Sequence, residues 1–319
     1  MDLSIIIVNW NSVDYLRACL SSIYRETGGI TFEVIVIDNA SSDGCEGVIR
    51  EEFPNVVLIQ STENLGFARA NNLGYTRSSA AILLFLNPDT EIRQDVFTKM
   101  VGHLRSYPSA GAVGARLLNS DGSLQSSCVQ AYPTIWNQLL DSELLRRAFP
   151  SSGLWGMKPL FSDGDEPAEI DAISGACFMV KRGVFEQAGL FSEDYFMYVE
   201  DLDLSYRIRK TGYSIYYLNG CPVVHHGGRS AAKQEAYFPN LRQQESLLQF
   251  FRTTRGDWYS KLYRVALAAA AATRIVLAVC SIPFGRFGFR SKTPASVLHK
   301  WSRILHWAVG LESWSTPRE

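Results

Sequence analysis

The sequence predicts an α/β fold in which helices cover both faces of a mostly parallel sheet. Strand-like and helix-like segments alternate from residue 4 to residue 86, which is the order typical of such sheets. The last of these strands, Ala81–Leu86, is apolar without alternation, as expected for a strand that is covered on both faces. The chain then turns through Asn87-Pro88-Asp89-Thr90, and open α/β sheets bind ligands beyond the carboxyl ends of their strands.

The spacing of apolar residues defines the elements of this first part of the chain. Val13, Leu16, Leu20 and Ile23 recur at helical intervals, whereas β-branched residues are frequent in Phe32–Ile37. The expected strands are residues 4–8, 32–37, 56–59 and 81–86, and the expected helices between them are residues 13–25, 48–53 and 67–78.

The pattern after residue 118 is less regular. Residues 119–168 are rich in Gly, Pro, Ser and Asp, and we expect a mobile segment there that faces a partner. Regular structure should return with a strand in "DAISGACFMVKR", a helix over Asp203–Lys210 and a strand over Tyr213–Leu218. Residues 240–255 are expected to be helical.

The C-terminal part of the chain differs from the rest in charge. Residues 242–319 hold 12 Lys and Arg but 4 Asp and Glu, a net charge of +8, whereas the preceding residues have a net charge of −9. A basic tail on an acidic body predicts an anionic partner for the tail, either a membrane or a nucleic acid. The basic stretches have few aromatic residues placed to stack on bases, which argues against nucleic acid.

Two stretches of this tail suit a membrane. Residues 265–284 are nearly all apolar, but the central Arg274 would be unfavourable in a membrane span by roughly 2.5–3.5 kcal/mol. Residues 297–311 form a basic amphipathic helix whose apolar face includes Trp301, as in helices that lie on a bilayer surface. The alternative is a helix packed on the protein body.

The remaining composition indicates a cytosolic protein. The N-terminus lacks the basic region of a signal peptide, so its short apolar run reads as the first strand. The six cysteines form no Cys-x-x-Cys pair, and we interpret them as reduced thiols instead of a disulfide or zinc framework.

Polar side chains follow each of the four expected strands of the first part. They are Asn9 and Asn11, Asp38 and Asn39, Asn64, and Asn87 with Asp89. The sequence has neither a Gly-x-Gly-x-x-Gly after the first strand nor a Gly-Lys-Ser/Thr loop, which argues against dinucleotide and P-loop sites. A nucleotide would then bind through carboxylates and amides, and Asp89 could hold Mg²⁺ or Mn²⁺ on a diphosphate. Alternatively, Asp89 only caps the turn.

A second acidic cluster, Glu200, Asp201 and Asp203, lies in "YVEDLDLSYR". Asp201 could cap the following helix, because acidic groups suit its positive end. It could instead be a general base whose pKa is raised by acidic neighbours and by burial near aromatic residues. The sequence favours neither interpretation.

The pair His225 and His226 ends a strand-like run in "VVHHGGRS". A neutral imidazole nitrogen can bind a metal, and the glycines would let the backbone approach a phosphate. Together with Arg229, these residues predict a site for a metal, a diphosphate or an acceptor.

Six of these motifs, in this order, resemble the family 2 glycosyltransferases. They are "SIIIVNWNSVDYLRACLSSI", "EVIVIDNASSDG", "ENLGFARANNLG", "LFLNPDTEI", "ISGACFMVKRGVFEQAGLFSEDYFMYVEDLDLSYRIRKTGY" and "VVHHGGRS". Within that family they are most similar to the bacterial rhamnosyltransferase-like branch. The likeness covers residues 3 to about 255, and the tail matches only loosely.

The resemblance implies a GT-A fold and an inverting transfer from a nucleotide-diphosphate-sugar that depends on Mg²⁺ or Mn²⁺. It implies that Asp38 binds the base or ribose and that Asn64 lines the nucleotide pocket. It also implies that Asp201 is the base in the pair Glu200-Asp201.

The metal ligands are implied in the same way. Asn87-Pro88-Asp89 stands in for an Asp-x-Asp motif, and because the first acid is Asn here, metal binding falls more heavily on Asp89. His225 resembles a further metal or diphosphate ligand, and His226 is the alternative.

The resemblance also suggests a domain organisation and a substrate. Residues 1–240 would be the catalytic domain, with a nucleotide-sugar-binding half over 1–118 and an acceptor half over 119–240, and residues 241–319 a helical, basic region. The expected donor is dTDP-L-rhamnose, with a UDP-hexose or UDP-galactofuranose as alternatives. The expected acceptor is a saccharide or lipid-linked saccharide of cell-surface polysaccharide synthesis, at the inner face of the cytoplasmic membrane.

Two other functions remain open on the sequence. A sugar nucleotidyltransferase would share the sheet and the metal, but no Gly-rich, basic triphosphate loop follows the first strand. A polysaccharide-binding or membrane scaffold without catalysis would have no need of Asp89, Asp201 and His225 together.

Overall fold

The structure is a computed structural model that describes residues 1–140, 143–162, 164–227, 238–281 and 294–311. The chain forms two compact units. The first unit contains Met1–Tyr132 and Arg146–Gln234, and the second contains Pro133–Leu145 and Glu235–Glu319. We describe each unit by itself.

The first unit contains the predicted α/β sheet. Four parallel strands lie side by side in the order β3 (Val57–Ser61), β2 (Phe32–Asn39), β1 (Leu3–Asn9) and β4 (Ile82–Leu86). Asn9 lies opposite Asp38, and Ile7 lies opposite Leu86, so these strands end at the same edge of the sheet. The predicted convergence of their polar ends is therefore a consequence of the strand register.

The other half of the sheet is mixed. β10 (Cys177–Lys181) runs antiparallel between β4 and β6 (Ala110–Leu118), and β11 (Ser214–His225) is parallel to β6. The short strands β5 (Thr90–Glu91) and β8 (Ala168–Ile170) pair antiparallel with β11. His225 lies opposite Thr90, so β5 carries the turn after β4 to the end of β11.

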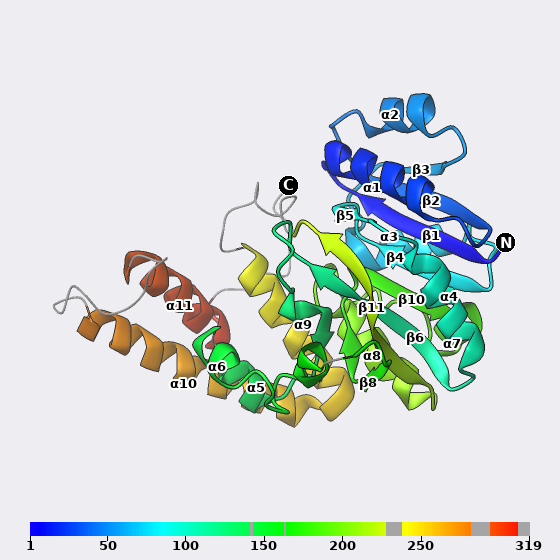
Figure 1. Ribbon diagram of the computed structural model, residues 1–319. Coiled ribbons are helices and arrows are strands. Elements are labelled where there is room, and N and C mark those ends of the chain that lie inside the picture. The colour runs from blue at the N-terminus through cyan, green and yellow to red at the C-terminus, as the bar shows by residue number, and fades with distance from the viewer. Residues whose placement is uncertain (141–142, 163, 228–237, 282–293, 312–319) are drawn as a thin grey trace. The chain divides into compact units, whose positions relative to one another are not determined.

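Helices cover both faces of this sheet (Figure 1). Every residue of β4 is buried, as its continuous apolar run predicts. The helices are α1 (Val13–Glu26), α2 (Cys45–Glu52), α3 (Gly66–Tyr75), α4 (Val96–Ser106), α7 (Arg182–Gln187) and α8 (Glu200–Lys210). The helix expected over Asp203–Lys210 thus begins three residues earlier, at Glu200.

Short elements occupy much of residues 119–168. They are η1 (Ser126–Cys128), β7 (Val129–Gln130), which pairs with β9 (Ala172–Ile173), α5 (Ile135–Leu139), α6 (Glu143–Ala148) and η2 (Lys158–Phe161). α5 starts with a capping box, in which the Thr134 side chain accepts from the backbone N–H of Asn137 and the Asn137 side chain accepts from that of Thr134.

The second unit is helical. α10 (Asp257–Ser281) packs against α9 (Phe238–Arg255), α11 (Pro294–Ala308) and α5. Ile304 and Ala308, on the apolar face of α11 that was predicted to meet a bilayer, are buried, whereas Leu311 is exposed, so this face is covered only in part within the protein. Arg274 of α10 donates to the carbonyl of Leu139, and its guanidinium lies 4.2 Å from the centre of the Trp301 ring.

Candidate active site

The ends of β1 and β2 are tied together by side chains that the sequence analysis placed in the donor site. Asn9 has no exposed surface: its amide donates to Ser41 Oγ at 3.2 Å and accepts from Ser12 Oγ at 2.8 Å. Asn11 accepts from the backbone N–H of Ser42 and has a positive φ of 50°. Asn9 therefore has no surface with which to contact a nucleotide-sugar. Asn9 and Asn11 instead fix the loops that follow β1 and β2.

The end of β2 is fixed to the loop before α3. Asn39 donates to Asn64 Oδ1 at 2.9 Å and accepts from the backbone N–H of Leu65 at 2.8 Å. The neighbouring Asp38 is largely buried and accepts from the backbone N–H of Ser41. Asp38, Asn39 and Asn64 thus lie together at the sheet edge, as the sequence predicts.

The turn after β4 meets the end of β11. Asp89 Oδ1 lies 3.2 Å from Nε2 of His225, and Asn87 Nδ2 lies 3.3 Å from the same nitrogen. The contact between Asn87 and His225 joins residues 138 positions apart in the sequence, and β5 brings the two segments together.

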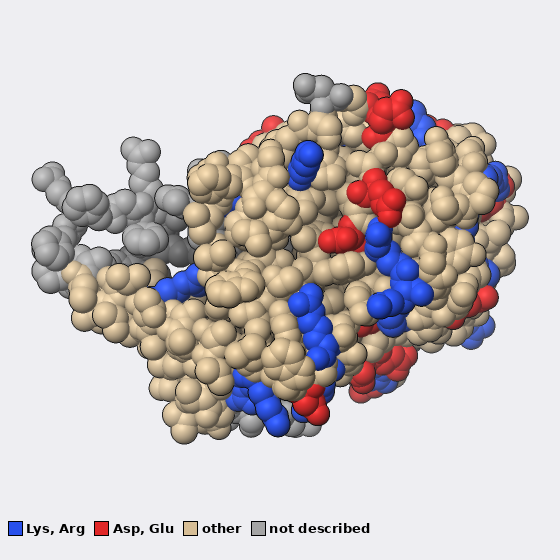
Figure 2. All heavy atoms as spheres, turned by 90° about the horizontal axis from the view of Figure 1, so that it is seen from below, with Lys and Arg blue, Asp and Glu red and all other residues tan. Residues whose placement is uncertain are grey.

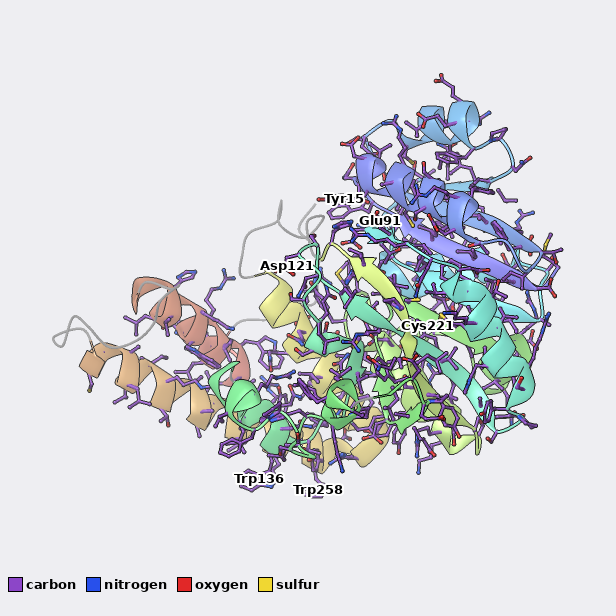
Figure 3. All side chains as sticks on the ribbon, in the orientation of Figure 1. Tyr15, Glu91, Asp121, Trp136, Cys221 and Trp258 are labelled. Carbon is purple, nitrogen blue, oxygen red and sulfur yellow. The ribbon has the colours of Figure 1, made fainter. Side chains whose placement is uncertain are left out.

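His226 has different neighbours. Its Nε2 lies 3.4 Å from Glu91 Oε2, its Nδ1 lies 2.8 Å from Ser120 Oγ, and its ring is 5.7 Å from the ring of Tyr15. Tyr15 and Glu91 lie together at this end of the sheet (Figure 3). The arrangement therefore separates the two histidines: His225 faces Asp89, whereas His226 faces Glu91. Arg229, the third predicted residue here, lies outside the described residues.

Asp89 and His225 fit a divalent cation by their donor chemistry. If His225 Nε2 carries no proton, it and Asp89 Oδ1 are two electron-pair donors facing each other, an arrangement that needs a positive charge between them. Their separation of 3.2 Å is close to the roughly 3 Å between neighbouring ligands with bonds of about 2.1 Å in an octahedral Mg²⁺ site. Among the described residues, no group of three or more His, Cys, Asp or Glu could hold a metal. Phosphate oxygens and water would therefore complete the coordination.

Asp201 is held near this turn by backbone hydrogen bonds. Its Oδ2 accepts from the N–H of Gly175 and its Oδ1 from the N–H of Leu202, both at 2.8 Å. The adjacent Ala176 accepts from the N–H of Asn87 at 3.0 Å. The segment Gly175–Ala176 thus connects the two predicted acids, although 112 positions separate Asp89 from Asp201 in the sequence.

Of the two interpretations of Asp201, the structure excludes the one in which it is the N-cap of α8. The residue at the N-cap is Val199, and Asp201 lies within the first turn of the helix. Asp201 as a whole is partly exposed. Burial raises the pKa of the Asp201 carboxyl, which would make its carboxylate a stronger base.

Glu200 is in a different environment. Its side chain is 6% exposed, and within the described part of the chain Oε2 has no hydrogen-bond partner. Burial and the nearby charge of Asp201 raise the pKa of Glu200 far above that of an ordinary glutamate. Two adjacent residues thus differ in exposure: Glu200 is buried, whereas Asp201 is partly exposed.

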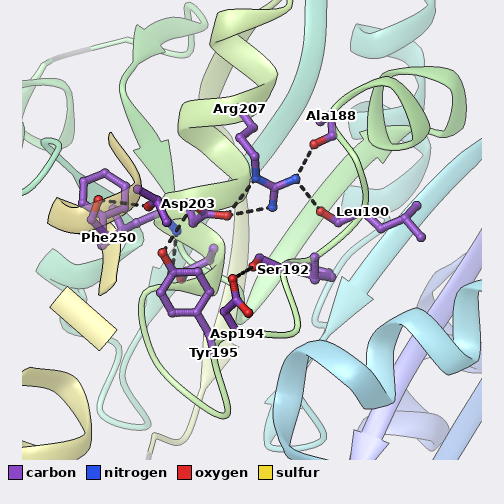
Figure 4. A network of polar contacts seen from close by, with 12 residues as sticks. Ala188, Leu190, Ser192, Asp194, Tyr195, Asp203, Arg207 and Phe250 are labelled. Atoms are coloured by element: carbon purple, nitrogen blue, oxygen red, sulfur yellow. Dashed lines mark hydrogen bonds and ion pairs between the residues drawn. The ribbon is translucent and has the colours of Figure 1, made fainter. Parts of the chain in front are cut away.

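The loop before α8 is strained and firmly anchored. Tyr198 and Val199 have φ values of 70° and 71°, a conformation that is unfavourable for a β-branched residue. Arg207 of α8 binds Asp203 at 2.8 Å and donates to the carbonyls of Ala188 and Leu190, so the helix is fastened to the chain that precedes it (Figure 4). This network fixes where α8 begins and hence where Asp201 lies.

Comparison with known proteins now places the chain in a family. Residues 4–188 match the family described as "Glycosyl transferase family 2". The chain belongs to this glycosyltransferase family. The matched stretch contains Asp38 and Asp89, whereas Asp201 and His225 follow it in the sequence.

Curated relatives of this glycosyltransferase include rhamnosyltransferases. It is 27% identical over 296 residues to an N-acetylglucosaminyl-diphospho-decaprenol L-rhamnosyltransferase of Mycobacterium tuberculosis, covering 88% of this chain and 93% of the relative. It is 23% identical to the rhamnosyltransferase WbbL of Escherichia coli, covering 70% and 82% of the two chains.

Solved structures support the fold of the glycosyltransferase. The mannosyltransferase PcManGT of Pyrobaculum calidifontis, determined with GDP-Man and Mn²⁺, superimposes with a TM-score of 0.57 at 19% identity. The match covers 99% of this chain and 88% of that one. The α/β fold with a mostly parallel sheet, predicted from the sequence, is thus confirmed as the GT-A type.

Proposed function

We propose that this glycosyltransferase moves L-rhamnose from dTDP-L-rhamnose to a lipid-linked saccharide, with inversion at the anomeric carbon. The observation that carries the proposal is the link from Asp201 through Gly175 and Ala176 to Asn87, beside Asp89. It brings a basic carboxylate near a pair of metal-binding side chains. The name of the mycobacterial relative supports both the sugar and the lipid-linked acceptor.

Asp201 is the general base in this proposal. Its carboxylate accepts the proton of an acceptor hydroxyl, whose oxygen attacks the anomeric carbon while the bond from that carbon to the diphosphate oxygen breaks. The backbone N–H groups of Gly175 and Leu202 hold the carboxylate in one orientation. Glu200 keeps its proton, so it adds no second negative charge beside the base.

Asp89 and His225 would hold the cation, Mg²⁺ or Mn²⁺. Asn87 lies next to the same imidazole nitrogen that faces Asp89. When bound, the cation would offset the negative charge that grows on the leaving diphosphate. The Mn²⁺ in the mannosyltransferase structure supports this assignment. Asp38 and Asn64 bind the nucleoside, and His226 lies next to the diphosphate.

A thermal-shift screen tests the donor. With Mn²⁺ present, dTDP-L-rhamnose is expected to raise the melting temperature more than UDP-hexoses or UDP-galactofuranose, because a ligand stabilises only the state that binds it. Transfer of rhamnose to a polyprenyl-diphosphate saccharide, with an inverted linkage by NMR, completes the test. Stabilisation by a UDP-sugar alone would contradict the choice of donor.

We further propose that α10 docks on the cytoplasmic membrane surface. It is the one helix of the described residues that is long and apolar enough to cross a membrane, and its surface is mostly exposed. A stripe along it, here called the α10 stripe, consists of exposed apolar residues at helical spacing: Trp258, Leu262, Val265, Ala269, Ala272, Val276 and Val279.

The surroundings of the α10 stripe support contact with the interface of a bilayer. Trp136 of α5 and Trp258 of α10 point outward on one side of the C-terminal unit (Figure 3), and tryptophan favours the membrane interface. Figure 2 shows that broad parts of the protein surface carry no charged side chains. Arg274 is engaged by Trp301 and Leu139, so it does not oppose burial of the stripe in lipid.

Vesicle flotation tests this contact. The double variant Val265→Asp/Val276→Asp is expected to bind vesicles of anionic phospholipid at least about tenfold more weakly, because each buried charge replaces an apolar contact. Val57→Asp, at an exposed valine of the first unit, is the matched control and should float like the wild type. Equal flotation of the double variant and the wild type would contradict docking through the stripe.

A further inference from the structure

Gln125 makes two hydrogen bonds to one residue, His225. Its Nε2 donates to the backbone carbonyl of His225 at 2.6 Å, and its Oε1 lies 2.9 Å from the ring Nδ1 of the same residue. Gln125 precedes η1, and its own backbone N–H donates to Leu117 of β6. The backbone of Gln125 is thus hydrogen-bonded to β6, and its side chain is hydrogen-bonded to the last residue of β11.

The pair of contacts determines which ring nitrogen carries the proton. A carbonyl oxygen can only accept, so the atom of Gln125 that faces it must be the amide nitrogen. The amide oxygen then faces Nδ1 and can only accept, so Nδ1 must carry the proton. In a neutral imidazole, the unprotonated nitrogen is then Nε2.

Of the two neighbours of Nε2, Asn87 agrees with this assignment, whereas Asp89 requires a cation beside it. Asn87 Nδ2 lies 3.3 Å from Nε2 and can donate to it, which requires a lone pair on the ring nitrogen. Asp89 Oδ1 lies 3.2 Å from Nε2 on the turn that carries Asn87. A carboxylate cannot donate a hydrogen bond to this lone pair, so the two atoms face each other favourably only with a cation between them.

We propose that Gln125 is a positioning residue that holds His225 in the tautomer able to bind the divalent cation. This inference rests on the proposed function, because it assigns Gln125 to the metal site of that proposal. Gln125 does not itself touch the cation; it acts through the ring of His225. Hydrogen-bond partners of metal-binding histidines are typically worth about 10–100-fold in metal affinity.

Nitrogen NMR of ¹⁵N-histidine-labelled protein tests the tautomer without substrate or metal. The chain has five histidines, and the resonance of His225 is assigned by its loss in His225→Gln. At mildly alkaline pH, wild-type Nδ1 is expected to be protonated and Nε2 unprotonated. Gln125→Met, which keeps the length and removes both hydrogen bonds, should shift the ring toward the Nε2-protonated form. Gln125→Glu retains an acceptor for Nδ1 and should keep the wild-type tautomer.

Calorimetric titration with Mn²⁺ measures the consequence. Gln125→Met is expected to raise the Mn²⁺ dissociation constant about 10–100-fold, and Gln125→Glu to raise it less. A wild-type ring protonated on Nε2, or an unchanged tautomer in Gln125→Met, would overturn the inference. If the tautomers are as expected but the wild type binds no Mn²⁺, the proposed metal site fails, whereas the control of the tautomer by Gln125 stands.

Discussion

Asp201→Asn is expected to lower the rate of sugar transfer by about 10²–10⁴-fold, the usual contribution of a general base. Asparagine has nearly the same shape and can still accept a hydrogen bond from Gly175 or Leu202, but it cannot take a proton from the acceptor. Donor binding should therefore be retained, as titration calorimetry with the nucleotide-sugar would show. A variant that transfers sugar at the wild-type rate would remove Asp201 from the role of base.

Glu200→Gln is the matched control for this experiment. Because the raised pKa of Glu200 keeps its carboxyl protonated near neutral pH, a neutral amide should replace it with much less loss of transfer than in Asp201→Asn. The protonated Glu200 also makes the stability of the wild type depend on pH. The folded state keeps this proton after the unfolded chain has released it. The free energy of unfolding of the wild type therefore falls as pH rises from the ordinary glutamate pKa to the raised one.

The variant has no such proton to lose. The difference in free energy of unfolding between Glu200→Gln and the wild type should therefore change with pH. From low pH to weak alkali it should shift in favour of the variant by about 1.4 kcal/mol for each unit by which the pKa of Glu200 is raised. Urea unfolding at several pH values measures the difference. An increase in the relative stability of the wild type with pH would contradict a buried, protonated Glu200.

Asp89→Ala is expected to abolish donor binding that depends on the metal. Removing a ligand should weaken Mn²⁺ binding by more than about 100-fold, because loss of a residue that only hydrogen-bonds to a ligand typically lowers metal affinity by about 10–100-fold. Calorimetric titration of the nucleotide-sugar with and without Mn²⁺ is the measurement. Glu91→Gln is the control, since Glu91 faces His226 and not His225. Wild-type donor affinity in Asp89→Ala would exclude the proposed metal site.

The sequence predicted the parallel half of the fold because its strands are continuous apolar runs that end in polar turns. Asn9, Asp38 and Asn87 were placed at one edge for this reason, and the strand register confirms that placement. The apolar run in β10 also predicted a strand, but apolar pattern does not encode direction, and β10 is antiparallel to both neighbours. No element was predicted for residues 91–118, although Val96, Phe97, Met100 and Val101 have the spacing of α4.

Contacts between distant residues limit what could be predicted for the site. The sequence around Gln125 gives no sign of a metal site, because the role of this residue depends on its contact with His225, 100 positions later. Asn9 was expected to face the donor, but packing of the loop after β2 buries it completely. The sequence allows Asp201 to be either a helix cap or a base, and the start of α8 at Glu200 excludes the N-cap position for Asp201.

A crystal structure with dTDP-L-rhamnose and Mn²⁺ would test most directly whether Asp89 and Asp201 serve one reaction. We expect Mn²⁺ bound by Asp89 and by Nε2 of His225, with the carboxylate of Asp201 facing the anomeric carbon on the side opposite the diphosphate. A donor whose anomeric carbon lies beyond the reach of an acceptor held by Asp201, or a metal bound away from Asp89, would contradict this mechanism.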